Sequence, residues 1–173
     1  MAILGVIALS PIVASALPPS GVIVVSATHP AGWTVQIDGA TLTSTPTATT
    51  SFVTGPGPAP LGAGSALLSV GTDGDGGVQL RQPSYVGTLL SDVTALSYST
   101  YVSTFMGCQA AYLILGLDTD GDGLVDDALF FEPCYQTGGY IGDSVPAQGA
   151  PMLGTWQTWN ALVGGWWNIN AGF

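Results

Sequence analysis

The sequence predicts an all-β protein, a single jelly-roll-like β-sandwich preceded by an apolar extension strand. Almost no stretch repeats apolar residues with the period of a helix, whereas about ten short runs have the character of strands. Turns rich in glycine and proline separate these runs, and the 173 residues include 25 Gly and 12 Pro. Because this length suits one domain, we expect residues 1–20 to form the extension and residues 21–173 the sandwich.

The N-terminal run is the most apolar part of the chain. Residues 2–9 have no polar side chain, and Pro11 separates them from a second apolar run, residues 12–16. We interpret both runs as a strand donated to a neighbouring subunit, since an exposed edge this apolar favours aggregation. The alternative is a secretory signal ending at Ala14-Ser15-Ala16, although no positive residue precedes it. The prolines disfavour a membrane span. The expected subunit contacts are Ile3, Leu4, Val6, Ile7, Leu9, Ile12 and Val13.

Further strands are expected along the rest of the chain. They cover residues 21–26, 33–39, 41–54, 65–70, 78–81, 95–102, 112–115 and 128–131. The segment between 65–70 and 78–81, Asp73-Gly74-Asp75-Gly76-Gly77, has turn chemistry, so these two strands are expected to pair as a hairpin. The Thr/Ser-rich run 41–54 is also compatible with an O-glycosylated stalk, which makes glycans candidate partners.

The composition limits the partners of this chain. It is 47% hydrophobic but only 7% charged, Arg81 is its only basic residue, and its formal net charge is −10. Such a chain cannot neutralise phosphates, which excludes nucleic acid and docking on anionic lipid. A surface so poor in charge suits a secreted protein that stays in an assembly better than a cytosolic protein, which depends on charge to remain apart from its neighbours.

Residues 118–127 have the pattern of a calcium-binding loop. Three aspartates alternate with small residues, and Gly123 follows where such loops turn sharply. Calcium takes about 6–8 oxygen ligands, and carboxylates this close repel one another without a cation. The flanking runs are strand-like and the Glu of an EF-hand is missing, so we expect a Ca²⁺ loop between two β-strands. The alternative is a hairpin whose Asp-Gly pairs only make turns. The expected ligands are Asp118, Asp120, Asp122, the carbonyl of Leu124, and Asp126.

The two cysteines, Cys108 and Cys134, flank the strands on either side of this loop. Antiparallel neighbours bring such positions together, so we expect a disulfide in an exported protein. The alternative is a pair of buried free thiols. The spacing does not match a zinc motif.

No catalytic group stands out, and we expect no enzymatic activity. The single histidine, His29, precedes a proline in a turn-like segment and has no nucleophile motif beside it. Glu132 is the only glutamate, and a glycosidase pair with Asp92 is disfavoured. Arg81 is expected to pair with Asp92 or Glu132. Trp156, Trp159, Trp166 and Trp167 suit a core or a subunit contact better than a sugar site.

Several segments resemble a group of largely uncharacterised secreted prokaryotic β-sandwich proteins with an Asp-x-Asp-x-Asp-Gly calcium loop. The resemblance spans about residues 60–167. Its segments are Gln79–Arg81, Leu90–Tyr101, Asp118–Asp127, Phe130–Pro133 and Thr155–Trp159. It implies an extracellular β-sandwich and names no activity. The apolar N-terminal run before a nearly charge-free sandwich is also similar to strand-donating filament subunits, such as archaeal bundling pili and biofilm-matrix fibres.

The sequence therefore leads us to expect a structural subunit of an extracellular filament, pilus or surface assembly. Residues 2–16 of one copy complete the sheet of the next, and calcium and a disulfide stabilise each subunit. The alternative is a secreted carbohydrate-binding or adhesive module that uses its C-terminal tryptophans.

Overall fold

Ten β-strands and three single-turn 3-10 helices make up the chain in the computed structural model, which describes residues 5–6, 23–38, 48–71, 76–104, 108–138 and 145–170. The all-β prediction is confirmed. The strands are β1 Gly5–Val6, β2 Thr34–Asp38, β3 Thr49–Thr54, β4 Gly64–Ser69, β5 Gly77–Arg81, β6 Ser97–Tyr101, β7 Leu113–Leu117, β8 Asp127–Phe131, β9 Trp156–Asn160 and β10 Trp167–Asn168. The helical turns are η1 Pro83–Tyr85, η2 Leu90–Asp92 and η3 Pro133–Tyr135. No helix in these ranges has the length and apolar character needed to cross a bilayer.

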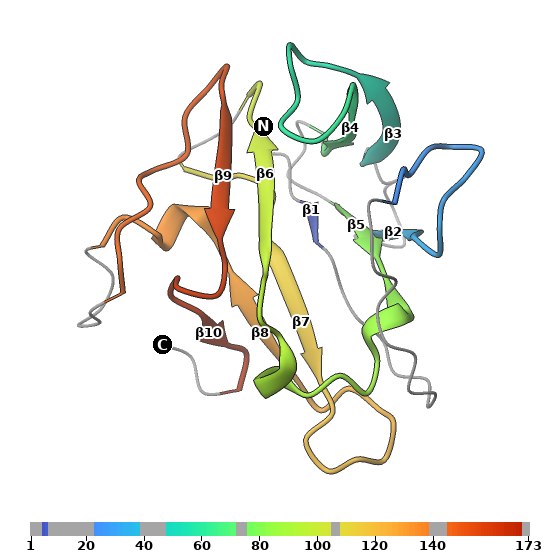
Figure 1. The fold of residues 1–173 in the computed structure, drawn as a ribbon, viewed down its shortest axis with the longest axis vertical. Coiled ribbons are helices and arrows are strands. Elements are labelled where there is room, and N and C mark those ends of the chain that lie inside the picture. The colour runs from blue at the N-terminus through green and yellow to red at the C-terminus, as the bar shows by residue number, and fades with distance from the viewer. Residues whose placement is uncertain are drawn as a thin grey trace.

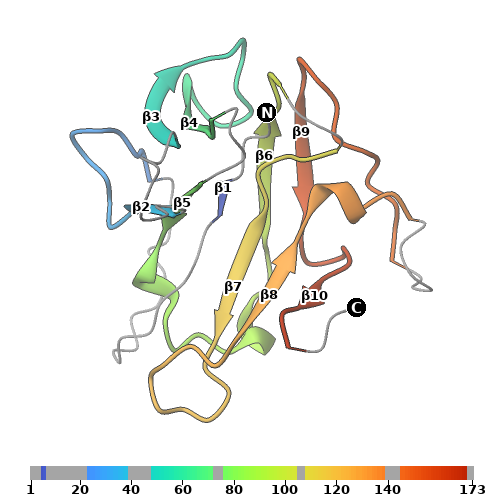
Figure 2. The ribbon, with the colours of Figure 1, turned by 180° about the vertical axis from the view of Figure 1, so that it is seen from behind.

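The strands form four small sheets that are arranged as two halves (Figures 1 and 2). The first half contains the sheet β1-β5-β2 and the hairpin β3-β4. The second half contains the sheet β10-β8-β7 and the pair β6-β9. All pairings are antiparallel except the parallel pairing of β1 with β5. The arrangement is sandwich-like, but this strand order does not establish the jelly-roll connectivity that we expected.

One expected strand pairing and one expected strand are wrong, although the strands expected at 65–70 and 78–81 are present as β4 and β5. Residues 65–70 and 78–81 do not pair with each other: β4 pairs with β3 around the loop 55–62, and β5 lies between β1 and β2. The turn residues between these two strands favour a hairpin. Each strand instead forms an extensive antiparallel ladder with a different partner, β4 with β3 and β5 with β2. In the predicted strand 21–26, the described residues 23–25 are not in a strand. Ile23 and Val24 are exposed, and Ser26 bridges to His29 in a turn.

The buried apolar side chains form one cluster in each half. The first cluster contains Ala48, Leu68, Val78 and Leu80, with Trp33, Val70 and Ala111 packed against it. The second contains Leu113, Phe131, Trp159 and Ala161, with Leu96, Tyr98 and Trp166 packed against it. The alternation expected in 95–102 explains one wall of the second cluster, since Leu96, Tyr98, Thr100 and Val102 are all at least partly buried.

The hairpin of β7 and β8 is the best-defined predicted unit. Its register runs from Leu113 opposite Phe131 to Leu117 opposite Asp127. At the end away from the turn, Cys108 and Cys134 form the predicted disulfide, with their Cα atoms 5.2 Å apart. The hairpin is therefore held covalently at one end and closed by the acidic loop at the other.

Gln136 joins the η3 segment to the segment at Gly165 through its fully buried side chain. Its Oε1 accepts a hydrogen bond from the Gly165 backbone N–H at 2.9 Å. Its Nε2 donates to the carbonyls of Gly165 and Glu132, at 2.9 and 3.1 Å. A buried amide in this position satisfies backbone groups that would otherwise be buried without a partner, so its loss leaves them unpaired.

We predict that Gln136→Leu lowers the free energy of unfolding by about 3 kcal/mol, because buried backbone groups lose their partners. Gln157→Leu is the matched control. Gln157 also bridges two backbone groups, Met152 N–H and the Ala150 carbonyl, but at an exposed site where water can replace it. Urea unfolding monitored by fluorescence measures both variants. Equal losses in the two would contradict the role assigned to Gln136.

Candidate functional site

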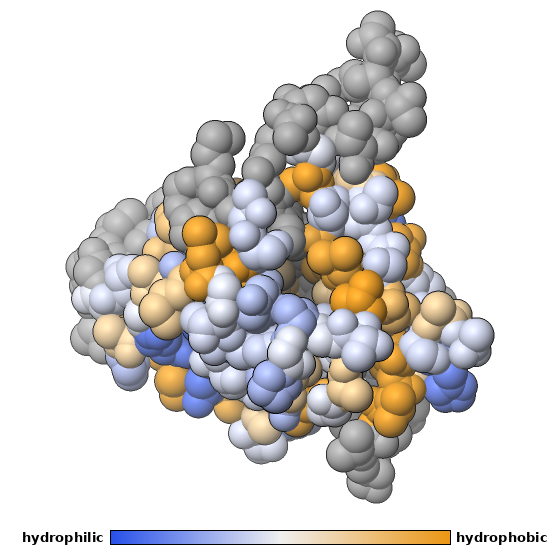
Figure 3. Space-filling view, turned by 90° about the horizontal axis from the view of Figure 1, so that it is seen from above, coloured by the Kyte–Doolittle hydropathy of each residue, from blue (hydrophilic) through white to orange (hydrophobic). Residues whose placement is uncertain are grey.

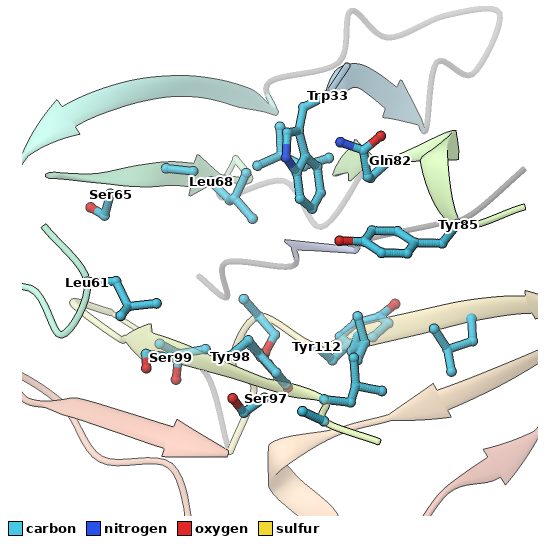
Figure 4. A pocket seen from close by; sticks show the side chains of 18 of the residues that line it. Trp33, Leu61, Ser65, Leu68, Gln82, Tyr85, Ser97, Tyr98, Ser99 and Tyr112 are labelled. Carbon is cyan, nitrogen blue, oxygen red and sulfur yellow. The ribbon is translucent and has the colours of Figure 1, made fainter. Parts of the chain in front are cut away.

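A large apolar groove separates the two halves of the molecule. Its volume is about 1270 Å³, whereas a single water needs only roughly 10–15 Å³ by the same measure. Trp33, Leu68 and Tyr85 point into it from the first half, and Tyr98 and Tyr112 line it from the second (Figure 4). Protein interiors normally leave few voids larger than one water, so a hollow of this size has the character of a binding site.

The N-terminal strand β1 lies in this groove. Gly5 is opposite Val78 and Val6 is opposite Gln79 in the parallel pairing with β5, and β1 also lies close to β7 of the second half. Figure 4 shows β1, the short blue strand, running between the side chains of the two halves. The other expected contact residues, Ile3, Leu4, Ile7, Leu9, Ile12 and Val13, lie outside the described residues.

Exposed leucines surround the groove. Leu61 is 91% exposed in the loop 55–62, and Leu89 is 65% exposed beside η2. Seen from above, apolar side chains reach the surface in several patches among weakly polar ones (Figure 3). Single exposed leucines are common on protein surfaces, but several around one apolar hollow make it a candidate binding surface.

The Tyr98 hydroxyl, a largely buried polar group that lines the groove in the second half, has a hydrogen-bond partner within the chain. The Tyr98 hydroxyl donates to the carbonyl of Ala111 at 3.3 Å. Burial raises the pKa of this hydroxyl, and the nearby Glu132 carboxylate raises it further, so Tyr98 stays neutral. The neutral Tyr98 hydroxyl therefore adds no charge to this part of the groove, whose lining is mostly apolar.

The acidic loop between β7 and β8 lies at one end of the groove, where Asp118, Thr119 and Gly121 contribute to its lining. The predicted sharp turns are present, with Gly121 at φ 81° and Gly123 at φ 89°, in the region that favours glycine. The base of the loop is closed by the Asp126 N–H, which donates to the Leu117 carbonyl at 2.8 Å.

Three of the expected ligands come together in this loop. Carboxylate oxygens of Asp118, Asp120 and Asp126 lie within 4.8 Å of one another, and all three side chains are exposed. Asp122 is not part of this group: its Oδ1 accepts from the Leu124 N–H at 2.8 Å. An oxygen cluster of this kind is compatible with a hard cation such as Ca²⁺.

Hydrogen bonds from the loop backbone orient these carboxylates. Asp118 accepts from the N–H groups of Gly121 and Gly123, at 2.7 and 2.9 Å. Asp126 accepts from the Thr119 N–H and hydroxyl, and these bonds lower the pKa of its carboxyl group. The loop thus keeps Asp126 ionised, which is the state that a cation ligand needs.

Comparisons with protein-family models, curated protein sequences and solved structures find no match to this chain. The function must therefore be argued from the groove, the loop and the chemistry of their residues.

The four C-terminal tryptophans are engaged inside the chain. Trp159 is fully buried and donates to Thr100 Oγ1 at 2.9 Å, and Trp166 donates to the Ala161 carbonyl at 2.8 Å. Trp167 stacks on Phe130 with ring centroids 4.1 Å apart, so that one face of each ring is covered. Trp156 packs edge-on against Tyr101. No observation here favours a sugar-stacking site built from these rings.

The groups considered for catalysis are dispersed. His29 is in an exposed turn, where its backbone bonds with Ser26. Arg81 does not pair with Asp92 or Glu132 as we predicted; its Nε donates to Gln79 Oε1 at 3.0 Å. Gln79 lies two residues before Arg81 on the same face of β5. Its side-chain amide oxygen, rather than a carboxylate, therefore accepts the hydrogen bond from Arg81.

Sequence reasoning missed the groove because its walls come from segments far apart in the chain. Trp33, Leu68 and Tyr112 belong to three different sheets or loops, and no local pattern joins them. The available signal was the clustering of leucines in turn-like segments, at Leu61 and at Leu89-Leu90, where exposed apolar side chains have no local packing role.

We predict that calcium stabilises this protein through the acidic loop. At a calcium concentration 100 times the dissociation constant, the gain is about 2.7 kcal/mol, or roughly 5–10 °C in Tm. Asp118→Asn reduces this gain, whereas Asp92→Asn, with the same loss of charge elsewhere, preserves it. Thermal unfolding with calcium or chelator measures the effect. An unchanged Tm across the calcium series would contradict the assignment.

Glu132 gives a second prediction, on pH. Burial raises the pKa of this half-buried carboxyl, and the Trp167 indole, which donates to it at 3.0 Å, partly opposes the rise. A raised folded pKa means that the folded state favours the proton. Stability is therefore lost as pH rises from the ordinary glutamate range through the folded pKa.

Glu132→Gln retains an acceptor for Trp167 but removes the charge, so we expect its Tm to exceed that of the parent at pH 7 and to match it at pH 3. Differential scanning calorimetry across this range measures both proteins, with Asp92→Asn as the control for net charge. A difference in Tm that is constant with pH would contradict the role given to burial.

Proposed function

We propose that this protein is a structural subunit of an extracellular filament or surface assembly, in which the N-terminal apolar strand of one copy fills the groove of the next. The observation that carries the proposal is the divided core. Val78 and Leu80 belong to one buried cluster and Phe131 and Trp159 to another, and a 1270 Å³ apolar groove lies between them. An apolar strand is the element that joins two such clusters.

The N-terminal run has the right chemistry for this place. It is rich in Ile, Leu and Val, which contribute about 1.5–3 kcal/mol each when fully buried. Burial of about eight such residues represents a gross gain on the order of 10–20 kcal/mol, before ordering costs. The position of Gly5–Val6 beside β5 supports the groove as the binding place of this segment.

An assembly built by strand donation of this kind has no fixed number of subunits. The donating run and the accepting groove are different surfaces of one chain, so each contact leaves one free run and one free groove. A head-to-tail contact that does not close into a ring gives a filament. No catalytic step is part of this function.

Other features fit an extracellular setting. The disulfide between Cys108 and Cys134 is of a kind that persists in oxidising compartments. The aspartate loop is suited to the calcium concentrations found outside cells. Because the loop lies at one end of the groove, a bound cation there holds the β7-β8 wall that the donated strand contacts.

We predict that the full-length chain forms filaments in calcium-containing buffer, as seen by electron microscopy, and that a chain lacking residues 1–16 gives only discrete particles. The truncated chain has lost the donated strand but retains an open groove. Filaments formed equally by both chains would contradict strand donation, and monomers from both would remove the filament function.

Two exposed groove residues sharpen this test. Because both leucines are exposed in the subunit, Leu61→Asp and Leu89→Asp are expected to stay folded. They place a charge where the donated strand is buried, so both variants assemble poorly. Ile169→Asp is the matched control: Ile169 is 58% exposed, close to the value for Leu89, and lies outside the groove lining. Loss of assembly in all three variants would show that added charge, rather than blockage of the groove, is responsible.

A further inference from the structure

The edge of β5 that receives β1 can hold only one strand. On one side, β5 pairs along its whole length with β2 in an antiparallel ladder. On its other side, β1 pairs with it in parallel, with Gly5 opposite Val78 and Val6 opposite Gln79. A donated strand that uses this edge must therefore replace the chain's own β1.

We propose that the protein exists first in a self-docked form, in which its own Gly5–Val6 closes the slot beside β5, and that assembly exchanges this segment for the same segment of a neighbour. This inference rests on the proposed function and adds a way in which filament assembly is regulated. While β1 is docked on its own β5, the slot cannot accept the strand of a neighbour. The same β1 is then not free to be donated to a neighbour, so this one contact prevents assembly in both roles.

Chain length permits the exchange. Sixteen residues, 7–22, join β1 to Ile23, and a segment of that length spans at most about 50 Å. It can therefore reach a neighbouring subunit as well as its own. The same backbone pairing forms in either case, which is why exchange of an identical element between copies has a low cost.

Tethering decides which form prevails in dilute solution. A strand joined to the rest of its own chain by a short segment has an effective concentration in the millimolar range for its own slot. Exchange is therefore favoured when subunits are concentrated.

A disulfide between Val6→Cys and Gln79→Cys tests the shared slot, since these positions are paired. The double variant is oxidised in dilute solution, where the crosslink forms within the chain, and is then concentrated in calcium buffer. We expect its yield of filaments to be at least about tenfold below that of Val6→Ser/Gln79→Ser, because tethering in the slot becomes permanent. The serine variant carries changes at the same positions without the crosslink.

Mixed single variants test donation between chains. Val6→Cys chains mixed with Gln79→Cys chains are expected to give disulfide-linked dimers during assembly, about tenfold more than Val6→Cys mixed with Met152→Cys. Met152 is exposed and away from the slot, so it controls for random collision.

The outcomes separate the two proposals. If the serine variant forms filaments and the crosslinked variant does so equally, the self-docked inference is overturned while the filament function stands. Absence of the crosslink in the dilute double variant also overturns the inference. If the serine variant and the parent chain both remain monomeric at every concentration, and mixed variants do not crosslink, the proposed function fails together with the exchange.

Discussion

The division of the apolar core into two clusters is the constraint on which the rest of this structure depends. Each half contains only short strands in two- and three-stranded sheets, which are marginal as independent units. The contacts that cross or approach the gap in the described residues include β1, which lies beside both β5 and β7, and Ala111, which packs against the first cluster. The Trp156 indole also donates to the Pro56 carbonyl at 2.8 Å. The energetics of the molecule therefore depend on what occupies the space between the halves.

The second half is the more cross-linked wall of that space. Its β7-β8 hairpin is held by the disulfide at one end and by the aspartate loop at the other, and Gln136 fastens the following segment to Gly165. Restriction at both ends matters because β7 faces the groove through Leu113 and Leu115. A binding surface that is ordered beforehand loses less conformational entropy when a partner arrives.

The sequence predicted local features well and long-range ones poorly. The hairpin around the aspartate loop, the disulfide and the alternation in β6 follow from residue spacing, which period-two geometry and turn chemistry control directly. The partner of β5 was predicted wrongly because strand pairing is decided by competition among distant segments, and Thr34–Asp38 pairs with the whole of β5 where the nearby β4 does not. The walls of the groove could not be predicted residue by residue, since Trp33 and Tyr112 line the same groove only through the tertiary fold. The partner of Arg81 was also predicted wrongly: we expected a carboxylate, but the hydrogen-bond acceptor is the neutral side-chain amide of Gln79.

The hydrogen bond between Trp156 and Pro56 has a spectroscopic consequence. It joins β9 in one half to the loop 55–62 in the other, and the indole also lies against Tyr101 along the groove. Indole emission responds to hydrogen bonding and to solvent contact, and Trp33 lines the opposite wall. The molecule thus carries an intrinsic fluorophore on each side of the gap. Changes in their emission report the separation of the halves in unlabelled protein, in real time and at concentrations too low for microscopy.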